Sequence, residues 1–138
     1  MIGITWKDCY ATHVGCFDSE HQHLVALIDQ YFRAIRENRG EQVVDSLLEK
    51  ILDYTASHFA HEEKMMREHT YPRYHAHRQE HLKMIASVKG FQSLLAEDGT
   101  DTGEILLTIR NFLRDWLLHH IVEEDQKYGP FFNQKGIC

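Results

Sequence analysis

Residues 58–81 read HFAHEEKMMREHTYPRYHAHRQEH and contain six of the 11 histidines in this 138-residue chain. On each side of Pro72 the stretch carries a polar pair four residues apart, His58 with Glu62 and His77 with His81. Residues at this spacing lie on the same face of an α-helix, one turn apart. The stretch therefore predicts two helices joined by a turn, each with a polar pair on one face.

The helical pattern continues in both directions from this stretch. Turn residues recur at 38–40, 69–72, 97–103 and 129–130, and apolar residues recur at helical spacing between them. We expect helices at residues 18–37, 41–66, 73–95 and 103–127. Asp18 or Ser19 is the expected N-cap of the first helix. Short connections make neighbouring helices antiparallel. The expected fold is therefore all-α, an up-down-up-down antiparallel four-helix bundle in a single domain (1–138) with an N-terminal extended arm (1–17).

Each expected helix carries histidine in its apolar stripe, with His21 on the first and His120 on the fourth. Counted from the turns near residues 39, 70 and 100, the histidines on neighbouring helices lie at heights that agree within about one helical turn. All four helices therefore deliver inward polar residues to one layer. Such a layer is costly to bury unless a metal satisfies it, and imidazole with carboxylate suits iron, copper, nickel or zinc.

The carboxylate from the fourth helix can be chosen in two ways. On a regular helix Glu124 lies one turn after His120, whereas Asp125 points roughly 140° away. Asp125 faces inward only if the helix contains a π-type turn, which functional sites often do. Ideal geometry thus favours Glu124. With either residue the layer holds seven candidate ligands, which are too many for one ion and suit two ions if the carboxylates bridge.

The residues resemble those of the hemerythrin family, specifically its single-domain bacterial members. The matching segments are DSEHQHL (18–24), HFAHEE (58–63), YPRYHAHRQEH (71–81) and WLLHHIVEED (116–125). The resemblance implies seven metal ligands: His21, His58, Glu62, His77, His81, His120 and Asp125. It thus selects Asp125 over Glu124. It also implies that His77, His81 and His120 bind one iron, that His21 and His58 bind the other, and that the two carboxylates bridge them.

The resemblance further implies two non-haem iron ions (Fe2+/Fe3+) with an oxo or hydroxo bridge and dioxygen as the ligand at an open coordination position. The expected function is reversible oxygen binding for storage, delivery or sensing, not enzymatic turnover. A di-iron redox enzyme (an oxidase, a peroxidase or a nitric-oxide-handling protein) or an iron or redox sensor is the alternative. Ferritin-like oxidases use two E-x-x-H pairs, whereas this chain has one, Glu20–His23, whose histidine lies off the inward stripe. HEEKM at 61–65 lacks the second histidine of a zincin.

Composition limits the other functions. The net charge of −6 and the lack of a basic run argue against nucleic-acid binding, and apolar stretches far shorter than about 20 residues argue against membrane insertion. Cys9, Cys16 and Cys138 lack C-x-x-C spacing and are expected to be reduced thiols of a cytoplasmic monomer. Besides dioxygen, an oxygen-requiring enzyme is a possible partner. The six remaining histidines are expected to be mostly exposed, with His119 as the candidate for an outer contact to the metal layer, and Phe59 and Trp116 are expected to pack the core.

Overall fold

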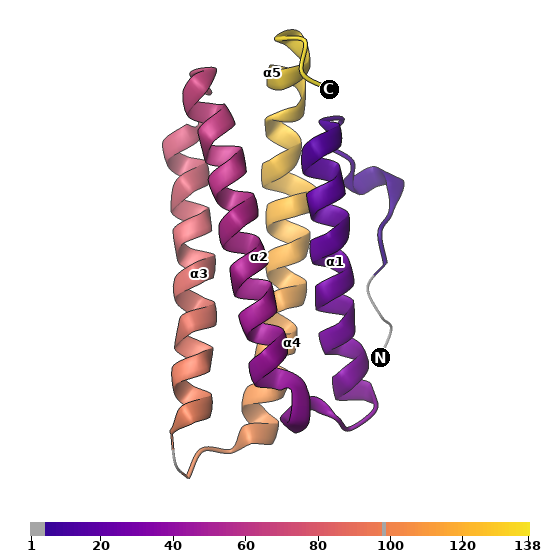
Figure 1. The fold of residues 1–138 in the computed structure, drawn as a ribbon, viewed down its shortest axis with the longest axis vertical. Helices are drawn as coiled ribbons and strands as arrows, with labels where there is room; N and C mark the ends of the chain where they lie inside the picture. Colours follow the sequence, from indigo (N-terminus) through magenta and orange to yellow (C-terminus); the bar gives the residue numbers. More distant parts are fainter. Residues whose placement is uncertain (1–4, 98) are drawn as a thin grey trace.

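The computed structural model describes residues 5–97 and 99–138. Four long helices run alternately up and down (Figure 1): α1 (Gly15–Arg36), α2 (Gly40–Glu68), α3 (Tyr74–Ala96) and α4 (Thr102–Trp116). A π-helical segment, η2 (Leu117–Glu124), a 3-10 turn, η3 (Asp125–Lys127), and a short helix, α5 (Gly129–Gln134), continue α4. A further 3-10 turn, η1 (Asp8–Tyr10), precedes α1, and the described residues include no strand. The expected all-α, up-down-up-down bundle is confirmed.

The first helix begins three residues before the predicted position. Its N-cap is Val14, so the prediction of Asp18 or Ser19 as the N-cap was wrong. Asp18 lies in the first turn, where its Oδ1 accepts hydrogen bonds from the backbone N (2.7 Å) and Oγ1 (2.8 Å) of Thr12. Acidic residues are favoured both at the N-cap and in the first turn of a helix. The pattern in the sequence therefore does not distinguish the two positions.

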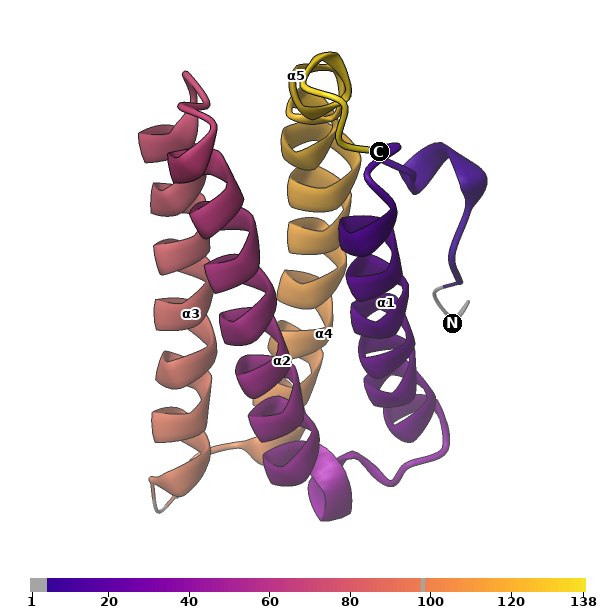
Figure 2. The ribbon, with the colours of Figure 1, turned by 45° about the horizontal axis from the view of Figure 1, so that its top comes forward.

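The described part of the arm lies along the outside of α1 (Figure 2). Tyr10 is buried, and its carbonyl oxygen accepts a hydrogen bond from Nε2 of Gln126 (3.0 Å). Asn133 donates a hydrogen bond to the carbonyl oxygen of His13 (3.0 Å). The arm is thus held against the same end of the bundle that carries η3 and α5.

Two hydrophobic clusters fill the bundle, and the predicted polar layer lies between them. The larger cluster occupies the end near the α1–α2 and α3–α4 turns and includes Leu24, Phe59, Met84 and Ile121. The smaller cluster occupies the opposite end and comprises Val14, Phe17, Met66, Tyr71, Tyr128 and Phe132. On α1, for example, His21 separates Phe17 of the smaller cluster from Leu24 of the larger one. In the described part of the chain, no helix has the length and apolar character needed to cross a membrane.

Candidate metal centre

All seven predicted ligands meet in the polar layer, and none is more than 2% exposed. The four helical rods contribute one residue or a pair each: His21 from α1, His58 and Glu62 from α2, His77 and His81 from α3, and His120 and Asp125 from the continuation of α4. The five imidazoles all direct Nε2 towards the two carboxylates.

The Glu62 carboxylate divides the imidazoles into two sets. Its Oε1 lies 3.3 Å from Nε2 of His77 and 3.1 Å from Nε2 of His81. Its Oε2 lies 3.4 Å from Nε2 of His21 and 3.2 Å from Nε2 of His58. The two oxygens of one carboxylate thus face opposite groups of histidines.

The Asp125 carboxylate repeats this division. Its Oδ1 lies 3.0 Å from Nε2 of His77 and 3.1 Å from Nε2 of His120, whereas its Oδ2 lies 2.9 Å from Nε2 of His21. We call His77, His81 and His120 the three-histidine cluster, and His21 and His58 the two-histidine cluster. Each carboxylate gives one oxygen to each cluster, which is the arrangement needed to bridge two ions.

The π-helical segment brings Asp125 rather than Glu124 into the layer. The backbone N–H of Asp125 donates to the carbonyl oxygen of His120, a hydrogen bond that spans five residues instead of four. Asp125 therefore lies one turn after His120 and is fully buried. Glu124 points towards the surface, where its Oε1 lies 2.9 Å from Nζ of Lys127. The expectation from a regular helix, Glu124, is thus replaced by Asp125.

The buried carboxylates are ionised because the imidazoles surround them. Burial by itself raises the pKa of Glu62, but the charge of His58 and the close approach of the His21 and His58 imidazoles outweigh it and hold the pKa well below its usual value. Burial and the charge of Glu62 raise the pKa of Asp125, yet His120 and His21 bring it well below its usual value. Both groups therefore have the anionic form that binds cations.

The polar atoms of the layer are suited to a metal rather than to one another. Among the described residues, both oxygens of Asp125 and the Nε2 atoms of His21, His58, His81 and His120 are buried without a hydrogen-bond partner of suitable geometry. Buried polar groups are almost always satisfied. Two groups of ligand atoms converge closely enough for an ion: Glu62 with the three-histidine cluster, and Glu62 and Asp125 with the two-histidine cluster. Imidazole and carboxylate donors fit iron, and the described site contains no thiolate.

Three residues that the sequence analysis did not select contact the ligands. Oε1 of Glu20 lies 2.6 Å from Nδ1 of His58, and Oε2 of Glu63 lies 2.8 Å from Nδ1 of His81. The Tyr128 hydroxyl donates a hydrogen bond of 2.5 Å to Oε2 of Glu62. Glu20 and Glu63 adjoin ligands in the sequence, which is a usable signal because ligand imidazoles commonly pair their second nitrogen with a carboxylate. The position of Tyr128 depends on the irregular end of α4.

Aromatic side chains cover the layer on the side of the larger hydrophobic cluster. The Phe59 ring stacks on His81 (3.7 Å between centroids, 4° between planes), and the Trp116 ring stacks on His120 (4.9 Å, 12°). Both side chains are buried, as expected. They join the polar layer to the larger hydrophobic cluster and restrict the orientation of the two imidazoles.

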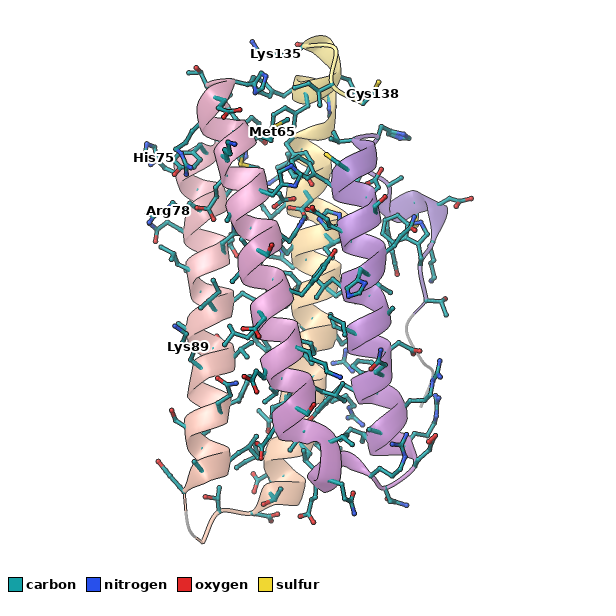
Figure 3. All side chains as sticks on the ribbon, viewed as in Figure 1. Met65, His75, Arg78, Lys89, Lys135 and Cys138 are labelled. Carbon is teal, nitrogen blue, oxygen red and sulfur yellow. The ribbon has the colours of Figure 1, made fainter. Side chains whose placement is uncertain are left out.

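The other six histidines lie outside the layer. His13, His23, His75 and His119 are exposed, and His61 and His69 are partly buried. His75 stands on the outer side of α3 (Figure 3). His119 is exposed, as expected for most of these histidines, and its Nδ1 lies 3.2 Å from a Glu123 oxygen at the surface instead of beside a ligand of the layer. His61 is the histidine that makes an outer contact with the layer: its Nδ1 lies 2.9 Å from Oε2 of Glu20, the carboxylate that contacts His58.

Comparisons with known proteins agree with this geometry. The family model of the hemerythrin HHE cation binding domain matches residues 13–132. The chain is 32% identical over 136 residues to a bacteriohemerythrin of Methylococcus capsulatus (94% of this chain and 97% of the relative). It is 25% identical to a myohemerythrin of Sipunculus nudus (89% and 88%). The crystal structure of a hemerythrin point mutant superposes with a TM-score of 0.80 at 26% identity (94% and 97%). The chain therefore belongs to the hemerythrin family.

Proposed function

We propose that the chain binds dioxygen reversibly at a non-haem di-iron centre, for oxygen storage, delivery or sensing. The observation that carries the proposal is the division of both carboxylates between two histidine clusters, with one oxygen of Glu62 and one of Asp125 facing each. The ligands in this proposal are His21, His58, Glu62, His77, His81, His120 and Asp125. Two ferrous ions held by them would supply the two electrons with which dioxygen is bound and released.

The protein's own residues support binding in preference to turnover. Every ligand is buried, and Phe59 and Trp116 stack directly on two of the imidazoles. A dry, histidine-rich layer excludes the water and protons that would release reduced oxygen species. Tyr128 fixes the orientation of Glu62 from the opposite side of the layer. These features favour a carrier over an oxidase or peroxidase.

The cellular compartment and the oligomeric state of the protein are part of the proposal. Cys9, Cys16 and Cys138 are free, exposed thiols in the described part of the chain, and exposed thiols persist in a reducing compartment. We expect a monomer in the cytoplasm, which gel filtration with light scattering and cell fractionation would check.

The test is one cycle of oxygenation followed by its reversal. Metal-free protein is loaded with ferrous iron without air, its iron content is measured, and its visible spectrum is recorded before air, in air and after purging. The same protein loaded with zinc, which has no redox chemistry, is the control. Two irons per chain and colour that appears in air and fades on purging are expected. Iron that oxidises at once and does not recover would favour a redox enzyme or sensor.

A further inference from the structure

The two histidine clusters offer different numbers of donor atoms. The three-histidine cluster has three Nε2 atoms together with Oε1 of Glu62 and Oδ1 of Asp125. The two-histidine cluster has two Nε2 atoms together with Oε2 of Glu62 and Oδ2 of Asp125. An ion in the two-histidine cluster therefore forms one bond fewer to the protein.

The outer carboxylates that contact Nδ1 of a ligand histidine, Glu63 and Glu20, also differ between the two clusters. Glu63, which pairs with His81 of the three-histidine cluster, has a side chain only 16% exposed. Glu20, which pairs with His58 of the two-histidine cluster, is 27% exposed and shares its oxygens with His61. Each carboxylate also has a second partner, since Nδ1 of His61 lies 2.9 Å from Oε2 of Glu20 and Nε of Arg78 lies 3.5 Å from Oε1 of Glu63. The difference that remains is exposure: water competes more for Glu20 than for Glu63, which makes Glu20 the weaker support.

Tyr128 adds a third difference. Its hydroxyl donates to Oε2 of Glu62, the oxygen that faces the two-histidine cluster, whereas Oε1 faces the other cluster. A strong hydrogen bond to a carboxylate oxygen withdraws electron density that the oxygen would otherwise give to a metal. The smaller number of donors, the more exposed partner carboxylate and the Tyr128 hydrogen bond thus all favour weaker binding at the two-histidine cluster.

We infer that the two ions bind in sequence: the three-histidine cluster fills first, and the two-histidine cluster fills second and releases its ion faster. Glu20 is the positioning residue for the second ion, because it holds His58 with the proton on Nδ1 and Nε2 turned towards the metal. This inference rests on the proposed two-metal site. It adds that a form with one ion is a stable state of the protein.

The test is a titration of the metal-free protein with Co2+ in the absence of air, followed by visible absorption and by calorimetry. Two steps are expected, each of one ion per chain, with the second at least about tenfold weaker. Transfer of Co2+ from the loaded protein to excess EDTA should accordingly show two phases of equal size. Neither measurement depends on oxygen binding.

Two matched variants assign the steps to the clusters. Glu20→Ala should weaken the second step by about 10- to 100-fold and leave the first within about twofold, the range expected when an outer partner of a ligand is lost. Glu63→Ala should weaken the first step instead and bring the two steps together. Glu20→Gln keeps an acceptor for Nδ1 of His58 and should restore part of the loss. Circular dichroism and thermal melting of each metal-free variant control for folding.

The outcomes separate the inference from the proposed function. Uptake of two ions in a single step, or a loss in the first step on Glu20→Ala, overturns the order of filling while leaving a two-metal site in place. Saturation with fewer than two ions contradicts the di-iron proposal itself.

Discussion

Replacing Gly129 by alanine is expected to lower the free energy of unfolding by about 2–3 kcal/mol. Gly129 is buried directly after Tyr128, and its backbone lies against the arm. A Cβ at this position would fall inside van der Waals contact of the carbonyl oxygen of Thr12, with the carbonyl carbon 3.3 Å away. Both obstructing atoms belong to the backbone, so a change of rotamer cannot relieve the clash.

The magnitude follows from what has to move. Overpacking a filled site typically costs about 1–3 kcal/mol. Displacing Thr12 also weakens, without breaking, its two hydrogen bonds to Asp18, of 2.7 and 2.8 Å, which adds about 1 kcal/mol in total. The lower entropy of an unfolded chain with alanine in place of glycine offsets about 0.4–1 kcal/mol. For a chain of this size the net loss corresponds to a fall in Tm of roughly 6–12 °C.

Urea unfolding of the metal-free protein, followed by far-UV circular dichroism, measures the effect. Gly90→Ala is the matched control, because Gly90 is exposed within α3 and no atom of the described residues other than its own helical surroundings lies within 4 Å of an added Cβ. This control should gain about 0.5–1 kcal/mol, since alanine is the better helix former. Equal stabilities of wild type and Gly129→Ala, or an equal loss in both variants, would refute the packing argument.

Three further predictions concern the metal layer. Asp125→Asn should reduce the affinity for Co2+ at both steps by at least about 10-fold, because it removes a charge that faces both clusters. Glu124→Gln is the control and should change the affinity less than about twofold, since Glu124 pairs with Lys127 outside the layer. Calorimetric titration compares the two variants. Tyr128→Phe should cost the metal-free protein about 1–3 kcal/mol in urea unfolding, because a buried hydrogen bond to an ionised carboxylate is lost; an unchanged urea midpoint would contradict it. In the metal-free protein burial lowers the pKa values of His58 and His77, but carboxylate partners outweigh it and raise both from 6.5 to about 10. The stability that the two protonated imidazoles contribute is complete below pH 6.5 and is lost as the pH rises towards 10. The urea midpoint of the metal-free protein should therefore fall between about pH 6 and pH 9.5. A midpoint that rises over this range would contradict the raised pKa values.

The bundle and the convergence of its ligands could be predicted because both follow from the helical periodicity of the sequence. His58 with Glu62, and His77 with His81, repeat at one helical turn, and short turns set their common height. The last carboxylate could not be derived from spacing, since a regular helix presents Glu124 and only the π-helical segment presents Asp125. Hydrogen bonds that span five residues have no simple sequence pattern. The choice of Asp125 came from the family resemblance.

Two other features at the end of the fourth helix could not be predicted, because they also depend on its irregular hydrogen bonding. Tyr128 reaches Glu62, and α5 forms, only after the chain has passed through a π-helical segment and a 3-10 turn. A turn at Gly129 and Pro130 was expected, whereas the structure places Pro130 in the first turn of α5, where its missing N–H costs nothing. Glu20 and Glu63 could have been identified, because each adjoins a ligand on a partly exposed flank of its helix.

The polar layer separates two ends of the bundle that differ in their stability against local unfolding. The larger hydrophobic cluster holds the four helices together on one side, and only a small group of mostly aromatic side chains holds them on the other. Local unfolding begins where few apolar contacts must break. In hydrogen-exchange experiments on the metal-free protein, amides near Phe17, Met66 and Phe132 should therefore exchange before those near Leu48 and Ile109. Because every ligand is buried, we expect ions to enter and leave the folded protein when this smaller end opens.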